Sequence, residues 1–526
     1  MGEMSLSVKR NYYIIAIMAL AVFSRAVLIT KCPGGIHADE AFSGYEAWSL
    51  LHYGIDSAGY SNPVYLTVWG GGMSVLNSIL MIPGIALFGL NSVTVKIPAM
   101  VMGVISVFVF YLLLKEIADI KMALWGSFLL AISPWHIMIS RYGMDANLCP
   151  AFVLIAMYLT VLGIKDNRNL KWAAVSWGIA LYSYVVLWIF EPIFLLLLFL
   201  YCMKYHKIKD YKQVLPAVVI LALFAAPLLL FIGVNMGIIP EIKTDILSIP
   251  VLPGFRSGEL GIGGYILNIK RLVKCFVLQN DGYMWNSVPL FGVYYIFSTP
   301  ISAVGLAVVI KRAVINFKKK CFGYEACLLI WLIAAIIMAF TQTTGTNLTR
   351  INPINPAMFI LVVVGIQWLL KKIRYRKTEF AIAGIYMTGF ACFMFYYFTG
   401  YSDAVAKMQL AGAKEALEYA KAQYETGAYG SEIYISGPLR HSQVLFYTQF
   451  PTEDYIQSVE QTVLSNGTYH VKQFGEYVWE TPQEYGGIRV MPVDETKTFI
   501  SSVEEYTVEL FDSYAVAIPC RLADGD

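Results

Sequence analysis

The sequence predicts a polytopic α-helical membrane protein with a small α/β domain at its C-terminal end. Of its 526 residues, 57% are hydrophobic and only 14% are charged, whereas a soluble chain carries about a quarter charged residues. Long apolar runs fill residues 1–402, and residues 403–526 are polar and numerous enough for one small folded domain. The net charge of +3 favours neither nucleic acid nor an acidic partner.

Apolar runs of membrane-spanning length recur along the first 402 residues. We expect about eleven of them to cross, because each is long enough for a helix through the hydrocarbon core. They lie near residues 11–30, 94–114, 121–139, 148–164, 171–187, 188–203, 214–234, 291–310, 325–341, 356–370 and 379–398. The first run follows basic residues but lacks a small-residue cleavage site, so we interpret it as a retained anchor.

The basic residues between these runs predict the topology. Four connections rich in Lys and Arg fall on one side if all the runs cross, and the positive-inside rule assigns that side to the cytoplasm. These connections are residues 165–171, 204–212, 311–320 and 371–377. Lys9 and Arg10 join them only if a further apolar stretch, 74–90, does not cross. That stretch is interrupted by Pro83 and Gly84, so we expect it to be re-entrant or interfacial.

This topology leaves two long loops and the C-terminal domain on the extracytoplasmic side. The loops are residues 31–93 and 235–290. Within the C-terminal domain, the residue pattern predicts local structure. It predicts helices over 404–424 and 442–450, and strands over 432–436, 506–510 and 514–518.

The first outer loop begins with an adjacent pair of acids, Asp39 and Glu40. Carboxylates near a bilayer are costly to desolvate and often belong to a functional site. At the end of the third run, Arg141 and Asp145 are four residues apart, so they share a helix face if the helix continues. They either form an ion pair or serve the site, with Arg141 holding a phosphate and Asp145 assisting. Arg25 either snorkels outward or orients the acids.

Further cations and aromatic residues fall on the same predicted face. Basic residues beside a bilayer either meet lipid head groups or hold a substrate phosphate; the candidates are Lys270, Arg271, Lys274 and Arg350. Interfacial aromatic rings either mark the membrane boundary or stack on sugars. The candidate substrate-binding residues are Tyr45, Tyr60, Trp69 and Asn347.

Carboxylates and phosphate-binding cations on an outer membrane face suit a sugar donor linked to polyprenyl phosphate. One carboxylate can act as general base on an acceptor hydroxyl. The phosphate is already a good leaving group and needs positive charge more than a general acid. Attack opposite the leaving group inverts the anomeric centre with one essential carboxylate.

At these residues the chain resembles GT-C fold glycosyltransferases of the protein O-mannosyltransferase and aminoarabinose-transferase superfamily (family 39-like). The matching pieces are the Asp39-Glu40 pair, the stretch Lys96-Ile97-Pro98-Ala99 at the start of the second run, and the segment 133–145, in the same order. The resemblance implies a polyprenyl-phosphate sugar donor, an extracytoplasmic acceptor, Asp39 as the base with Glu40 as its neighbour, and Lys96 near the phosphate. The chain departs from the family at residues 61–65, where a motif with paired prolines is absent.

Two other functions stay open from the sequence: a transporter or flippase of lipid-linked sugars, and an inactive membrane scaffold. A transporter should carry inverted repeats and acids at the bilayer midplane, and neither is evident. The acceptor is a protein, a wall polymer or a glycolipid, and membrane lipid is the remaining expected partner.

Adjacent carboxylates can bind Mg²⁺ or Mn²⁺, but the sequence identifies no third oxygen ligand. The eight cysteines show no CxxC spacing, which argues against a zinc site. We therefore expect no metal and no cofactor.

Overall fold

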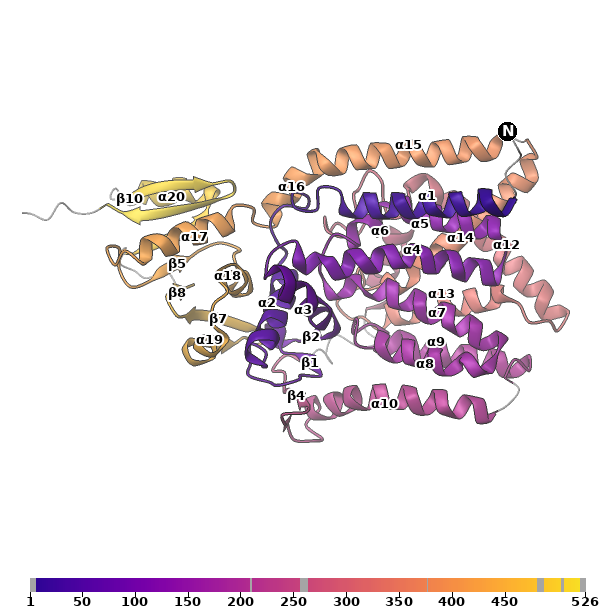
Figure 1. The fold of residues 1–526 in the computed structure, drawn as a ribbon, viewed down its shortest axis with the longest axis horizontal. Coiled ribbons are helices and arrows are strands. Elements are labelled where there is room, and N and C mark those ends of the chain that lie inside the picture. Colours follow the sequence, from indigo (N-terminus) through magenta and orange to yellow (C-terminus); the bar gives the residue numbers. More distant parts are fainter. Residues whose placement is uncertain are drawn as a thin grey trace, which may run out of the picture. The chain divides into compact units, whose positions relative to one another are not determined.

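The computed structural model describes residues 6–208, 211–255, 264–375, 377–479, 487–502 and 506–520. The chain divides into two compact units (Figure 1). The first comprises Met1–Ile29, Pro98–Leu230 and Arg256–Phe398, and the second comprises Thr30–Ile97, Phe231–Phe255 and Thr399–Asp526.

The first unit is helical, and most of its helices run roughly parallel to one another in Figure 1. Each predicted apolar run contains at least part of one of its helices. They are α1 (Leu6–Ala26), α4 (Ile97–Ile117), α5 (Ile120–Ile132), α6 (Pro134–Ile139), α7 (Cys149–Lys165), α8 (Leu170–Ala180), α9 (Leu187–Lys204), α10 (Tyr211–Asn235), α11 (Tyr265–Val273), α12 (Thr299–Lys318), α13 (Tyr324–Phe340), α14 (Asn355–Ile373) and α15 (Thr378–Phe398). Among the described residues, 7 helices are long and apolar enough to cross a membrane, and shorter apolar helices accompany them. A multi-pass membrane protein is therefore confirmed, while the count of eleven crossings stays a prediction.

The third predicted run is broken into two helices. The hydroxyl of Ser133 accepts a hydrogen bond from the His136 N–H at 3.1 Å and caps α6. Pro134 occupies the first turn of that helix, where its missing N–H costs nothing. Because α6 then ends at Ile139, the helix does not continue to residue 145, and Arg141 and Asp145 do not share a helix face.

In the second unit, residues 31–93, the first predicted outer loop, are largely helical. They hold α2 (Ala38–Tyr53), α3 (Leu76–Phe88) and a short hairpin of β1 (Tyr65–Leu66) and β2 (Met73–Ser74). Helix α3 has 13 residues, so it spans about 20 Å, less than the roughly 30 Å of a hydrocarbon core. The Ser78 hydroxyl ties it to α2 by donating to the Ser43 carbonyl at 2.9 Å. These features favour the expectation that residues 74–90 do not cross.

The C-terminal part of this unit is built on a mixed seven-stranded sheet of order β10-β11-β9-β5-β8-β7-β6. Strand β5 is parallel to β8 and β9, and the other pairs are antiparallel. The strands are β5 (Ile433–Ile435), β6 (Glu460–Val463), β7 (Tyr469–Phe474), β8 (Tyr477–Val478), β9 (Ile488–Pro492), β10 (Tyr506–Phe511) and β11 (Tyr514–Pro519). The helices are α16 (Gly400–Met408), α17 (Ala413–Tyr424), α18 (His441–Thr448), α19 (Thr452–Ser458) and α20 (Val493–Ser502). A hairpin of β3 (Ile242–Lys243) and β4 (Ser248–Ile249) from the second outer loop belongs to the same unit.

Most of the predicted local structure in this domain is confirmed, because β5, α18, β10 and β11 fall on the expected segments. The helix predicted over 404–424 is instead divided between α16 and α17. Leu410 and Gly412 both have positive φ in the intervening turn. A Cβ on Gly412 would lie 2.0 Å from the Phe511 carbonyl oxygen, so this close approach requires glycine.

Strand β11 separates two packed layers. Tyr514, Val516 and Ile518 belong to the large core of the unit, whereas Ala515 and Ala517 lie in a small cluster on the other face. This alternation follows from the two-residue period of a strand.

Helix α2 belongs to the same large core. Its residues Ala41, Tyr45 and Trp48 share one cluster with Val444 and Phe446 of α18. Residues 31–93 and the C-terminal domain therefore fold around one hydrophobic core, although α2 and α18 are almost 400 residues apart in sequence.

Candidate functional site

Asp39 and Glu40 are adjacent in sequence but lie in different environments. The Glu40 carboxylate accepts a hydrogen bond from the His37 N–H at 3.0 Å, and His37 Nδ1 accepts one from the Asp39 N–H at 3.2 Å. This pair of bonds is a capping box, which closes the N-terminal end of α2. Glu40 is fully buried, whereas the Asp39 side chain is 38% exposed. Asp39 is therefore the carboxylate that a ligand can reach.

Trp69 is the aromatic neighbour of this carboxylate. Its indole Nε1 donates to Asp39 Oδ1 over 3.4 Å, and the Arg440 guanidinium lies over its ring, 4.8 Å from the centroid. Trp69 has φ 56°, in the left-handed region that costs a bulky residue conformational energy. The next residue packs tightly, because a Cβ on Gly70 would lie 2.4 Å from the Gly467 carbonyl oxygen. Both features fix the turn that places the indole beside Asp39.

A cavity of about 260 Å³ adjoins Trp69 within the second unit. Its wall is formed by α2, the segment after α2, the β1–β2 turn, Val251 and the C-terminal domain. The aromatic and imidazole rings that line it are Phe42, Tyr60, Trp69, His441, Tyr455 and Tyr469. Ser57, Thr67 and Gln461 add hydroxyl and amide groups. Such a mixture of rings and a few polar groups is typical of small-molecule sites.

His441 contributes a neutral ring to this wall. Burial, and secondarily the charge of Arg440, lower the pKa of His441 to about 3. The imidazole packs edge-on against Phe42 at 6.0 Å and against Trp69 at 5.1 Å. It is therefore uncharged at neutral pH.

The predicted aromatic residues divide into two groups. Tyr60 and Trp69 line the cavity, and the Tyr60 hydroxyl donates to the Glu241 carboxylate. Tyr45 is 1% exposed, and its hydroxyl donates to the Phe450 carbonyl at 2.7 Å. Tyr45 therefore joins α2 to the C-terminal domain rather than lining the cavity.

A buried acidic pair lies behind the same segment. Both Glu46 oxygens accept hydrogen bonds from Ser57, and Asp56 Oδ1 accepts from the N–H groups of Ala58 and Tyr60. Burial raises the pKa of Glu46 to about 8 and that of Asp56 to about 6. These acids hold the residue 56–60 turn that carries Tyr60 to the cavity.

Lys96 lies in the second unit and is 2% exposed. Its ammonium group donates to the Pro33 carbonyl at 3.2 Å, which supports the segment that leads into α2. Its predicted role at the donor phosphate stays a prediction.

In the first unit, two buried arginines bond the ends of helices. Arg141 Nη1 donates to the carbonyls of Ser24 at 3.3 Å and Arg25 at 2.9 Å, in the last turn of α1. Arg25 in turn donates to the carbonyls of Leu130 at 3.2 Å and Ala131 at 2.9 Å, in the last turn of α5. Cations at helix C-termini satisfy carbonyls that lack helical partners and complement the helix dipole.

Asp145 lies beyond this pair, at the start of a short 3₁₀ turn, Asp145–Asn147. It is 9% exposed, and its Oδ1 accepts from the Ala146 N–H at 2.7 Å. Its assisting role, like the phosphate role of Arg141, stays a prediction.

Two other predicted phosphate-binding residues meet at one loop of the first unit. Arg350 Nη1 donates to the Gly345 carbonyl at 3.2 Å and to the Thr344 hydroxyl at 2.6 Å. The Arg271 guanidinium packs against the same glycine, because a Cβ there would lie 2.7 Å from Arg271 Cζ. Asn347 accepts from the Arg350 N–H at 2.9 Å and shapes this loop. Two like charges at one loop favour an anion between or beside them.

Lys270 and Lys274 are exposed on the same segment. Helix α11 is held to the loop by Asn268, whose side chain bonds the Gln342 carbonyl and the Thr346 N–H, both at 2.8 Å. The predicted phosphate-binding residues of segment 270–274 and Arg350 therefore lie in one region of the first unit.

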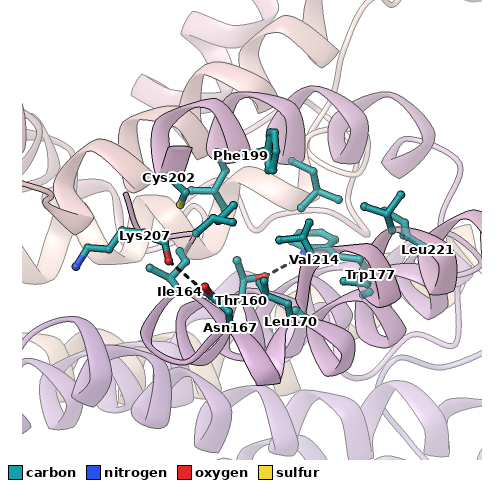
Figure 2. A pocket seen from close by; sticks show the side chains of 17 residues that line it. Thr160, Ile164, Asn167, Leu170, Trp177, Phe199, Cys202, Lys207, Val214 and Leu221 are labelled. Atoms are coloured by element: carbon teal, nitrogen blue, oxygen red, sulfur yellow. Dashed lines mark hydrogen bonds between the residues drawn. The ribbon is translucent and has the colours of Figure 1, made fainter. Parts of the chain in front are cut away.

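A second cavity, of about 230 Å³, lies among α7, α8, α9 and α10 of the first unit (Figure 2). Its wall is mostly apolar, and the Thr160 hydroxyl accepts from the Trp177 indole at 3.0 Å. At one end Asn167 donates to the Lys207 carbonyl at 3.1 Å, while the Lys207 amine points away from the cavity. This wall suits a hydrocarbon chain more than a sugar or a phosphate.

Among the described residues, no group of three or more His, Cys, Asp or Glu side chains is arranged to hold a metal ion. The expectation of a metal-independent site therefore stays a prediction.

Sequence reasoning missed the contribution of the C-terminal domain to the candidate site. Arg440, His441, Tyr455 and Tyr469 surround the cavity or Trp69, yet they follow Asp39 by about 400 residues. No local pattern in the sequence predicts contacts at that separation.

Comparison with known proteins identifies the fold. A family model described as dolichyl-phosphate-mannose-protein mannosyltransferase matches residues 78–231. The structure is similar to that of ArnT from Cupriavidus metallidurans bound to undecaprenyl phosphate, with a TM-score of 0.58 and 11% identity over 99% of this chain and 100% of that chain. It also resembles the archaeal oligosaccharyltransferase AglB from Archaeoglobus fulgidus in complex with an inhibitory peptide and a dolichol-phosphate, with a TM-score of 0.51 and 12% identity over 99% of this chain and 75% of that chain.

No curated protein matches the chain by sequence. At these identities the structural likeness establishes the fold, and the chain has the GT-C fold of membrane glycosyltransferases that its sequence resemblance implied.

Proposed function

We propose that the protein is a membrane glycosyltransferase that moves a sugar from a polyprenyl-phosphate-linked donor to a hydroxyl of an extracytoplasmic acceptor. The observation that carries this proposal is the reachable carboxylate of Asp39, held at the start of α2 and beside an aromatic cavity. The GT-C fold supports it, as do the polyprenyl phosphates bound to the two similar proteins.

In this proposal Asp39 is the general base. Its carboxylate accepts the proton of the acceptor hydroxyl as the hydroxyl oxygen bonds to the anomeric carbon of the donor. The bond from that carbon to the phosphate oxygen breaks, and polyprenyl phosphate leaves with the bonding electrons. One carboxylate is sufficient for this displacement, and the anomeric configuration inverts.

For the donor phosphate we propose Arg271 and Arg350 of the first unit. Their guanidinium groups gather at Gly345, and guanidinium pairs bind phosphate oxygens with charge-assisted hydrogen bonds. Such cations stabilise the charge that develops on the leaving phosphate. Lys270 and Lys274 add exposed positive charge nearby.

The proposal is tested by transfer from radiolabelled sugar–polyprenyl phosphates to cell-envelope acceptors in membranes that contain the protein. We expect Asp39→Asn to reduce transfer at least 100-fold, since a general base contributes about 10²–10⁴-fold. Asp454→Asn, an exposed carboxylate in α19, is the matched control and should retain transfer. If Asp39→Asn transfers sugar at the normal rate, the base is wrong. If labelled lipid crosses vesicles while no sugar is transferred, the protein is a transporter.

A further inference from the structure

The aromatic cavity of the second unit is walled by rings from several segments of the chain. Its rings come from α2, the residue 56–60 turn, the Trp69 turn, α18, α19 and β7, so residues 31–93 and the C-terminal domain both build it. Both segments belong to one unit and share its large core, so the wall is formed within a single unit.

The chemistry of the wall is neutral throughout the described residues that line it. Tyrosine hydroxyls, a buried neutral imidazole and the Gln461 amide supply hydrogen bonds, and the rings supply flat apolar faces. Two cations, Arg440 and Lys243, contact the Trp69 and Tyr60 rings at 4.8 and 4.9 Å from the ring centroids, but neither lines the cavity. A charged ligand would therefore lose hydration without gaining an opposite charge from the described side chains that line the cavity, which costs free energy. An uncharged ligand with many hydroxyl groups and an apolar ring face suits this wall.

The size of the cavity limits its occupant. Its volume of about 260 Å³ lies below the range of about 300–1,000 Å³ that is typical of drug-sized ligands. One sugar ring is of suitable size, whereas a branched glycan or a folded peptide segment is too large.

The cavity is coupled to Asp39 through one side chain. Trp69 contributes its ring to the wall and its indole N–H to the Asp39 carboxylate. A ring that stacks in the cavity therefore lies beside the residue that orients the proposed base. A donor sugar, by contrast, is joined directly to a phosphate, which needs a cation within hydrogen-bond reach. The described residues that line the cavity include no cation, and Arg440 contacts the Trp69 ring without lining the cavity.

We infer that this cavity binds an uncharged sugar ring of the acceptor, so that the enzyme extends or decorates a neutral glycan. Tyr469 and Gln461, both from the C-terminal domain, are the specificity-determining residues. This inference rests on the proposed glycosyl transfer, and it assigns the C-terminal domain a part in acceptor recognition.

The test is binding of free sugars to the purified full-length protein in nanodiscs, measured by saturation-transfer NMR. The probes are glucose, galactose, mannose and N-acetylglucosamine, with glucuronic acid as the charged counterpart. We expect at least one neutral sugar to bind, and glucuronic acid to bind at least 10-fold more weakly than glucose. Tyr469→Ala should weaken the neutral sugar at least 10-fold, and Gln461→Ala should weaken it at least 3-fold.

Matched controls separate recognition from folding. Tyr419→Ala removes a half-buried ring that packs on Phe511 in the same unit, and Gln473→Ala removes a half-buried amide on β7. Both should bind as the wild type does. Gln461 is exposed, so its variant tests the cavity even if Tyr469→Ala fails to fold.

Competition with donor analogues distinguishes a cavity that binds the sugar of the acceptor from one that binds the sugar of the donor. If citronellyl-phosphomannose or citronellyl-phosphoglucose displaces the bound neutral sugar, the cavity holds the donor and the inference is overturned. The inference is also overturned if glucuronic acid binds as tightly as glucose, or if Tyr469→Ala and Gln461→Ala both bind the neutral sugar as tightly as the wild type does. The binding assay does not depend on glycosyl transfer. If the protein binds neutral sugars but has no transferase activity, the proposed function is refuted while the sugar-binding site is retained.

Discussion

In the helical unit, the two arginines with the most complete burial bond carbonyls at the ends of α1 and α5. In the second unit, by contrast, one acid of an adjacent pair closes a helix and the other reaches solvent beside a cavity. Both regions place charge near an apolar run. The difference shows that a charge near a membrane helix has two uses, and that the hydrogen-bond partners of each group decide between them.

The largest effect that the comparison predicts is on stability. Arg141→Ala leaves the carbonyls of Ser24 and Arg25 without a buried donor, so we expect the unfolding free energy to fall by about 3 kcal/mol. Arg440→Ala removes an exposed guanidinium that contacts only one described aromatic ring, Trp69, and should cost less than about 1 kcal/mol. Thermal unfolding in detergent measures both variants. Equal losses would contradict the helix-end role of Arg141.

A second contrast concerns how stability depends on pH. The pKa of Glu46 is raised to about 8 in the folded state by burial, so the folded protein binds this proton more tightly than the unfolded chain does. The unfolding free energy should therefore fall as pH rises from about 5 to about 8, by more than about 1 kcal/mol. Glu46→Gln should reduce this slope, because the amide does not titrate.

Glu453→Gln is the control for this experiment, because Glu453 is exposed on α19. It should leave the pH dependence of thermal unfolding unchanged. A wild-type slope of the opposite sign, or the same slope in Glu46→Gln, would show that Glu46 is ionised in the folded protein.

The next effect is on donor binding. Arg271→Gln or Arg350→Gln removes one of the two guanidinium groups at Gly345, so we expect the KM for the polyprenyl-phosphate donor to rise about 10-fold, equivalent to about 1.4 kcal/mol. Lys274→Gln, which removes an exposed ammonium from the same segment, should raise it less. Steady-state transfer assays measure the three variants. An unchanged KM in both arginine variants would show that Arg271 and Arg350 stabilise the loop around Gly345 and do not bind the donor phosphate.

The smallest expected effect is that of metal removal. The proposed base and phosphate-binding groups require no metal ion, so transfer activity should be unchanged after dialysis against EDTA. A loss of activity that Mn²⁺ or Mg²⁺ restores would contradict this expectation. The same assay on Asp39→Asn would then show whether the ion acts through this carboxylate.

The helical fold was predictable because length and apolarity determine where a chain crosses a bilayer, and each predicted run contains at least part of an observed helix. Helix ends were less predictable. Ser133 and Pro134 end one helix and begin another, and the period of the apolar pattern does not report such a break. The spacing of His37 and Glu40 matches a capping box, but histidine is an uncommon capping residue, so the signal was weak.

The cavity was not predictable from the sequence. Trp69 and Tyr60 were identified as candidate sugar-binding residues, but their partners His441, Tyr455 and Tyr469 lie in the C-terminal domain. Their contact depends on the core that α2 shares with α18. A shared core between segments so far apart arises from tertiary packing, and no local residue pattern encodes it.

The most direct test of the account separates Asp39 from Glu40. Transfer rate per folded molecule and thermal unfolding midpoint are measured for Asp39→Asn and Glu40→Gln side by side. We predict that Asp39→Asn loses at least 100-fold in rate and keeps the wild-type midpoint within about 2 °C. Glu40→Gln should lower the midpoint, because a charged capping contact is weakened, while keeping the rate within about 3-fold. The reverse pattern, with transfer dependent on Glu40 and independent of Asp39, would contradict the account.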